Sequence, residues 1–122
     1  MAKMESMHRN ETQDMFVDQA RARLEEVRVM EKDVKERMKT APDVIKEDLA
    51  ACAVDIEMFI SLADVEVDMV ANASDEDWAA RRGRVDNAIG DAQRELERAH
   101  EIMNNPYAYV RSPDNFPRRG ID

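Results

Sequence analysis

The chain has 122 residues, of which 43% are apolar and 37% charged, and its formal net charge is -9. This composition excludes general disorder, and the length suits one domain whose core needs neither disulfides nor a metal. With three glycines and no proline between Pro42 and Pro106, the chain has too few turn signals for an all-β fold.

The first predicted element is a helix from Thr12 to Ala41, and nothing in the sequence forbids a start as early as Lys3. Apolar residues recur in it at intervals of three or four, as on the buried face of an amphipathic helix. They are Phe16, Val17, Ala20, Leu24, Val27, Met30, Val34, Met38 and Ala41. Glu31 also falls on this seam, but Met30 takes the core position if the helix keeps its natural period of 3.6. Pro42 ends the helix because the residue before a proline is pushed out of the helical region.

The second predicted helix runs from Asp43 to Ala73. Its main apolar stripe is Ile45, Leu49, Cys52, Ile56, Phe59, Ile60, Ala63, Val67 and Val70. As at the first helix, Val67 is preferred to its neighbour Glu66 for the core position. We expect Cys52, the single cysteine, to be a small buried hydrophobe in a reducing compartment. Since the N-terminus lacks the apolar segment of a secretory signal and no apolar run is long enough to span a membrane, we expect a cytoplasmic protein.

Ser74 is the predicted N-cap of a third helix, which covers residues 75–104 and ends at Asn104, Asn105 and Pro106. Its apolar stripe is the most regular of the three. The stripe consists of Trp78, Val85, Ile89, Ala92, Leu96, Ala99 and Met103. Because the connections are short, residues 1–104 are predicted to form an all-α, antiparallel up-down-up three-helix bundle with long helices.

Residues 105–122 differ from the rest of the chain and are predicted to form an extended C-terminal arm. They hold three of the four prolines, together with Tyr107, Tyr109 and Phe116. Two interpretations remain open. The aromatic side chains either pack back onto the bundle or bind a partner, as extended proline-rich and aromatic segments often do.

No catalytic residue, cofactor site or metal site is predicted. The three glycines are too far apart for a phosphate-binding loop, and neither histidine belongs to a catalytic motif. The best metal signal is Glu97 with His100, one turn apart on the third helix. A carboxylate-bridged metal protein nevertheless stays the least supported alternative, because the predicted core positions leave Glu97 facing water.

The negative charge is segregated: ten acids and no lysine, arginine or histidine lie between Glu47 and Ala80. The predicted acidic surface consists of Asp48, Asp55, Glu57, Asp64 and Asp68. The other helices can neutralise part of this charge across the bundle. Alternatively, the protein is an acidic decoy or inhibitor, for example phage-encoded, that imitates nucleic acid or occupies a basic site on a partner. Direct nucleic-acid binding is disfavoured because the chain lacks a basic footprint.

The second helix carries more apolar surface than a peripheral helix of a three-helix bundle needs. A second stripe consists of Val44, Ala51, Met58 and Val65, which repeat every seven residues, with Leu62 and Met69 beside them. Either the C-terminal arm covers this stripe, or it is an interface for a second copy or another protein. The leading hypothesis is therefore a non-enzymatic interaction protein, such as an adaptor, accessory subunit or small assembly component. We expect a homo-oligomer or a subunit of a larger complex, with no membrane partner.

Overall fold

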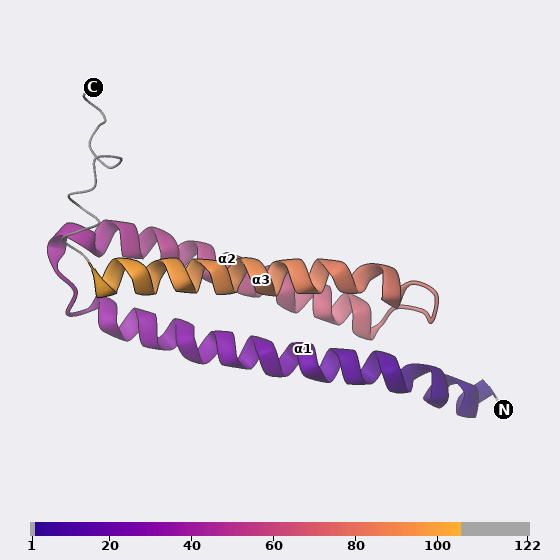
Figure 1. Cartoon of the computed structure of the whole chain (residues 1–122). Coiled ribbons are helices and arrows are strands. Elements are labelled where there is room, and N and C mark those ends of the chain that lie inside the picture. Colours follow the sequence, from indigo (N-terminus) through magenta and orange to yellow (C-terminus); the bar gives the residue numbers. More distant parts are fainter. Residues whose placement is uncertain (1, 106–122) are drawn as a thin grey trace, which may run out of the picture.

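The computed structural model describes the backbone of residues 2–105 and the side chains of residues 11–105. These residues form three helices and no strand: α1 (Ala2–Met38), α2 (Asp43–Ala71) and α3 (Trp78–Asn104). The helices lie side by side, and successive helices run in opposite directions (Figure 1). The prediction of an all-helical chain is confirmed for this range, whereas residues 106–122 of the predicted arm lie outside it.

The helix α1 starts close to the earlier of the two predicted starts, Lys3, and it ends before the predicted end. It begins at Ala2, ahead of Thr12, and it ends at Met38, three residues before Ala41. Beyond Met38 the backbone N–H groups of Lys39, Thr40 and Ala41 donate to carbonyls three residues earlier, at 3.2 to 3.3 Å. The chain thus leaves the α-helix through a tighter turn before Pro42, which excludes the helical conformation from the residue in front of it.

The helix α3 begins three residues later than predicted. The Ser74 carbonyl accepts hydrogen bonds from the backbone N–H groups of Asp77 and Trp78, both at 3.1 Å. The Ser74 hydroxyl also accepts from the Asp77 N–H, at 3.3 Å. Ser74 therefore closes a separate turn that contains the three acids, and the regular helix starts where Trp78 enters the core.

The core lies between the three helices and consists of the predicted stripes, with two corrections. On α1, Met30 is 44% exposed, and the neighbouring Glu31 side chain is only 14% exposed. This face of α1 keeps a 3.5-residue spacing, which brings Glu31 to the seam, where its carboxylate lies 3.4 Å from Lys35 Nζ. On α3, Ile102 is fully buried and Met103 only partly, because a natural helix drifts from a strict heptad.

One polar side chain, Gln13, is buried in the core although the predicted stripe did not include it. Its Nε2 donates to the carbonyls of Val70 at 2.7 Å and Ala73 at 3.0 Å. These carbonyls lie at the C-terminal end of α2, where intrahelical donors run out. Gln13 thus ties α1 to the end of α2. Its place four residues before Val17 is the sequence signal that could have identified it.

An aromatic contact lies at the same end of the bundle, near the turn between α2 and α3. The ring of Phe16 on α1 lies 6.0 Å from that of Trp78 at the start of α3, in a tilted arrangement. The Arg82 guanidinium lies 5.7 Å from the centre of the Trp78 ring, which is a cation–π distance. All three helices are therefore joined at the turn between α2 and α3.

Candidate protein-interaction surface

The face of α2 turned away from the core is apolar and exposed. All six residues of the predicted second stripe are exposed, with Met58 at 56% and Leu62 at 46%. Neither α1 nor α3 covers them. The main stripe on the opposite side of α2 is buried, as predicted, apart from the half-buried Phe59.

Val54 enlarges this face and was missed in the sequence. Its side chain is 66% exposed, more than any other large apolar side chain of α2. It lies three residues after Ala51 and four before Met58, which is helical spacing. We use the name outer stripe for Val44, Ala51, Val54, Met58, Leu62, Val65 and Met69. At 100° per residue these seven positions fall within an arc of roughly 80° on α2.

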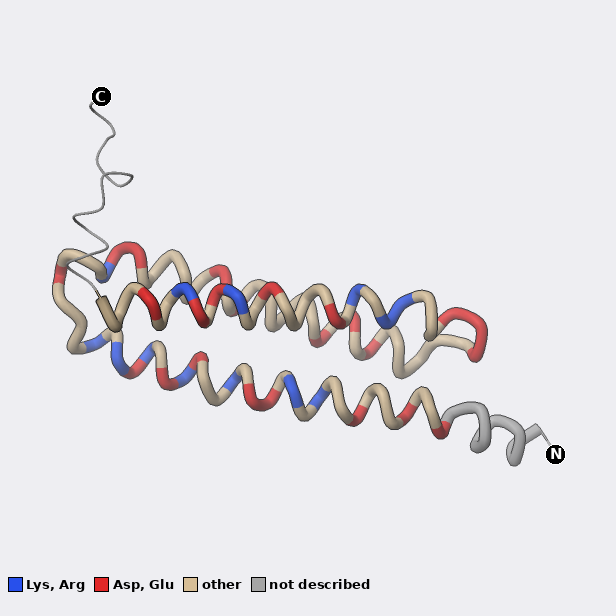
Figure 2. Tube along the Cα trace, viewed as in Figure 1, with Lys and Arg blue, Asp and Glu red and all other residues tan. Residues whose placement is uncertain are grey.

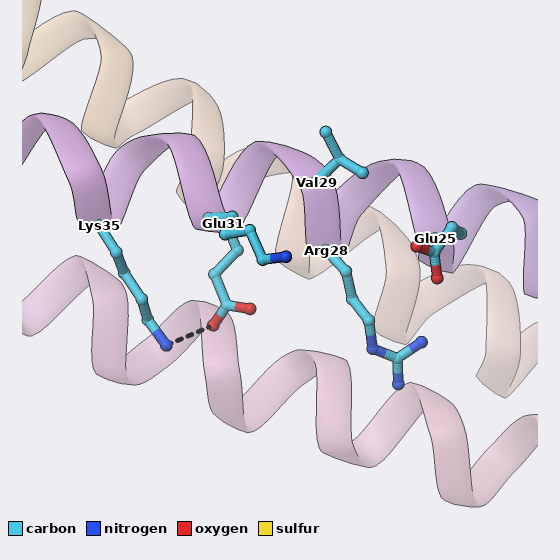
Figure 3. A pocket seen from close by; sticks show the side chains of 6 residues that line it. Glu25, Arg28, Val29, Glu31 and Lys35 are labelled. Atoms are coloured by element: carbon cyan, nitrogen blue, oxygen red, sulfur yellow. Dashed lines mark ion pairs between the residues drawn. The ribbon is translucent and has the colours of Figure 1, made fainter.

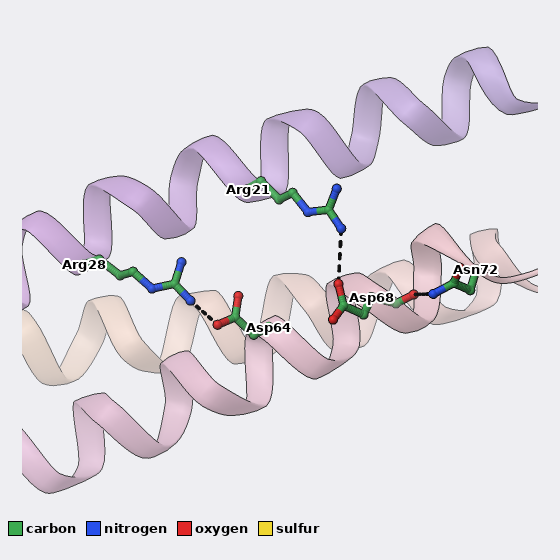
Figure 4. A network of polar contacts seen from close by, with 5 residues as sticks. All are labelled: Arg21, Arg28, Asp64, Asp68 and Asn72. Carbon is green, nitrogen blue, oxygen red and sulfur yellow. Dashed lines mark hydrogen bonds and ion pairs between the residues drawn. The ribbon is translucent and has the colours of Figure 1, made fainter.

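On one side of the outer stripe, the acids of α2 form ion pairs with α1. Arg21 Nη2 lies 3.2 Å from Asp68 Oδ1, Arg28 pairs with Asp64, and Lys35 Nζ lies 3.7 Å from Glu57 Oε1. Figure 4 shows the Arg21 and Arg28 pairs along the seam between the two helices. We call these three pairs the ion-pair ladder. Partly exposed pairs of this kind contribute about 0 to 1 kcal/mol each.

The predicted acidic surface is therefore divided. Glu57, Asp64 and Asp68 belong to the ion-pair ladder, while Asp48 and Asp55 are half-buried on the other border of the outer stripe, with Glu66. No base interrupts the tube from Glu47 to the start of α3, and basic residues flank it on α1 and α3 (Figure 2). The bases of α1 therefore neutralise the acids on the border of the outer stripe that is turned toward α1.

The described base closest to the outer stripe is at its C-terminal end. Arg81 Nη1 lies 4.0 Å from Met69 Sδ, within range of a weak contact between a guanidinium donor and a thioether. Arg81 is the first base after the acidic stretch, and it places one positive charge beside Met69. On α2 itself, the rest of the outer stripe is bordered by carboxylates, except for Lys46 near the N-terminal end.

Cys52 lies in the α2–α3 interface, next to the acidic border. The thiol is buried, as predicted, and it lies near Glu95 of α3. Burial raises the pKa of the Cys52 thiol above its ordinary value of 9.0; Glu95 and Asp55 raise it further, and Arg98 opposes them. A thiol with a raised pKa is a poor nucleophile at neutral pH, so this environment favours an inert structural cysteine.

Among the described side chains of α1, those of residues 11–38, fewer large apolar side chains are exposed than on α2. Met15 and Val29 are both more than half exposed, and charged residues lie between and beside them. On α3, Gly83 has no atom within 4 Å of the place where a Cβ would stand, and Gly90 has only the Arg94 guanidinium, at 3.9 Å. Neither glycine therefore permits a close approach of another described element.

A hollow on the surface of α1 is charged rather than apolar. It is lined by Glu25, Arg28, Val29, Glu31, Lys32 and Lys35. In Figure 3 the Lys35 and Glu31 side chains meet inside it, and Arg28 points along it. Its lining includes neither a histidine nor a cysteine, and Arg28 and Lys35 belong to the ion-pair ladder. This hollow is a product of packed ion pairs and offers no site for nucleophilic chemistry.

The predicted metal signal on α3 is not part of a metal site among the described side chains. Among the side chains of residues 11–105, no group of three or more histidine, cysteine, aspartate or glutamate residues is arranged to hold a metal ion. Glu97 is exposed and His100 half-buried. No helix in the described part of the chain has the length and apolar character needed to cross a bilayer. Tyr107, Tyr109 and Phe116 lie outside the described residues.

The comparisons with known proteins give no further constraint on function. No protein-family model, no curated protein and no solved structure matches the chain.

Proposed function

We propose that this protein is a non-enzymatic protein–protein interaction module that binds its partner through the outer stripe of α2. It would work as an adaptor, an accessory subunit or a small assembly component. Residues 105–122, with Tyr107, Tyr109 and Phe116, are proposed as a second contact. The reduced, buried Cys52 suits a cytoplasmic setting.

The exposure of the outer stripe carries this proposal. Single exposed apolar side chains are normal on protein surfaces, but seven along one helix face are typical of an interface. Full burial of side chains such as Met58 and Leu62 stabilises a complex by about 1.5 to 3 kcal/mol each. The methionines add side chains that adapt to the shape of a partner.

The acidic-decoy alternative has less support. Three of the five predicted surface acids already have cationic partners on α1, so they present less free charge to a basic site. Salt separates the two functions, because an apolar interface survives high ionic strength and an electrostatic one does not.

The test is the paired substitution Met58→Lys with Leu62→Glu, which keeps the net charge constant and disrupts the outer stripe. We expect a folded protein that has lost self-association or the binding of its native partner, measured by light scattering and co-purification at low and high salt. The matched control is Met15→Lys with Val29→Glu, which makes the same kind of change at exposed positions of α1.

The control variant should keep all association. The proposal is wrong if the wild type is a monomer that binds nothing and the Met58→Lys, Leu62→Glu variant is destabilised. That result would mean that another part of the chain covers the outer stripe.

A further inference from the structure

The two borders of the outer stripe differ in how their acids are compensated. The ion-pair ladder neutralises Glu57, Asp64 and Asp68 on the border turned toward α1. On the other border, no described lysine or arginine forms an ion pair with Asp48 or Glu66. The apolar face thus keeps a row of carboxylates beside it that no described cation pairs with.

This charge pattern disfavours a second copy as the occupant of the outer stripe. Between Glu47 and Ala80 the chain has no base, so two α2 helices packed through this face would place acids opposite acids along most of their length in either orientation, and only Lys46 near one end could oppose an acid. Like charges across a helix interface are repulsive, and such flanking charges decide which helices pair. A self-complementary helix pair would instead alternate acids and bases along its borders.

We propose that the outer stripe binds a basic amphipathic helix of another protein, with an apolar seam flanked by lysine or arginine. This inference rests on the proposed function and names its partner class. The seam from Val44 to Met69 spans 26 residues, or about 38 Å along the helix axis at 1.5 Å per residue, so the partner helix needs about seven turns to cover it. Its positive flank would pair with Asp48 and Glu66.

The position of Arg81 favours one orientation of the partner helix along α2. This guanidinium lies beside Met69 at one end of the outer stripe. Lys46, at the other end, is already paired with Asp43 at 3.5 Å, and the other charges of α2 along the stripe are negative. The end of the partner that reaches Met69 therefore carries a neutral or acidic residue at the position facing Arg81. The lysines and arginines lie along the remaining turns.

The test uses three synthetic 25-residue helical peptides, each below the concentration at which it self-associates. The first has a leucine seam flanked by lysine, the second has the same seam flanked by glutamate, and the third keeps the lysines with glutamine in the seam. Fluorescence anisotropy measures the Kd of each peptide for the full chain at low and high salt.

We expect the lysine-flanked peptide to bind at least tenfold more tightly than the other two at low salt. The preference over the glutamate-flanked peptide should narrow at high salt, because salt screens exposed charges. Met58→Lys with Leu62→Glu should weaken this binding at least tenfold, and Met15→Lys with Val29→Glu should leave it unchanged. Asp48→Asn with Glu66→Gln, which neutralises the unpaired border, should narrow the difference in Kd between the lysine and glutamate peptides severalfold.

Four outcomes would overturn the inference. If the lysine-flanked and glutamate-flanked peptides bind with equal Kd, the acidic borders do not select a partner by charge. If the lysine peptide with glutamine in its seam binds as tightly as the one with leucine, the attraction is only electrostatic. Self-association through the outer stripe, without any preference among the peptides, would leave the proposed function standing and make the partner class wrong. A monomer that binds no peptide, together with a destabilised Met58→Lys, Leu62→Glu variant, would refute both.

Discussion

The core face and the outer stripe of α2 are both apolar and both follow helical spacing, yet one is buried and the other is exposed. The core face is rich in isoleucine, with Ile45, Ile56 and Ile60, and it packs against α1 and α3. The outer stripe contains Met58 and Met69, and neither described neighbour covers it. Hydrophobic periodicity thus locates the apolar faces of a helix, whereas tertiary packing decides which of them is inside.

The largest difference in stability is expected when the same charge is placed on each of the two faces of α2. Ala63→Asp buries a carboxylate without a partner in the core and should destabilise the fold by more than about 3 kcal/mol. Ala51→Asp makes the same change on the exposed face and should cost less than about 1 kcal/mol, mostly through helix propensity. Thermal and urea unfolding measure both. Equal effects would mean that the outer stripe is buried in solution.

A smaller effect is expected at the C-terminal end of α2. Gln13→Ala removes the donor to the carbonyls of Val70 and Ala73 and should lower stability by about 1 to 3 kcal/mol. Gln19→Ala is the control, because Gln19 is exposed on the same helix. Urea unfolding compares the two variants. If they are equally stable, the buried amide contributes nothing to the attachment of α1.

The smallest effect concerns pH and Cys52, which lies on the core face of α2. Because burial raises the pKa of its thiol above 9.0, the folded state holds the proton more tightly than the unfolded state does. The stability contributed by this difference is complete below pH 9 and is lost as pH rises through the raised value. Urea unfolding of wild type and Cys52→Ala from pH 7 to pH 10.5 should show a steeper alkaline loss in the wild type. Parallel curves would show that the thiol proton does not contribute.

The sequence predicted the buried faces well because a long, regular stripe averages over many residues. Leu24 on α1, Ile56 on α2 and Leu96 on α3 are each at the centre of a predicted stripe and are buried. The exposure of Met58 and Leu62 also follows from the pattern, since one helix cannot bury more than its share of surface in a bundle of this size. Whether they bind a partner stays a prediction.

The errors in the sequence-based prediction come from competition between adjacent positions. At Met30 and Glu31 the apolar residue was preferred, but the carboxylate lies at the seam because Lys35 lies beside it. Gln13 was missed because it is polar: its spacing from Val17 places it on the buried face, but the carbonyls that satisfy its amide belong to another part of the chain. Val54 was missed because it lies outside the seven-residue repeat of its neighbours.

The ion-pair ladder has a consequence for helix register. Its cations, Arg21, Arg28 and Lys35, are spaced by seven residues. A shift of α1 by one heptad toward the start of α2 would move Lys35 from Glu57 to Ala50 and lose that pair. A shift in the other direction would move Arg21 past Ala71, the last residue of α2, and lose its pair with Asp68. Each pair contributes little stability, but together they make every shifted alignment lose a pair, as flanking charges do in coiled coils. The ladder thereby favours a single alignment of two apolar seams that would otherwise tolerate sliding.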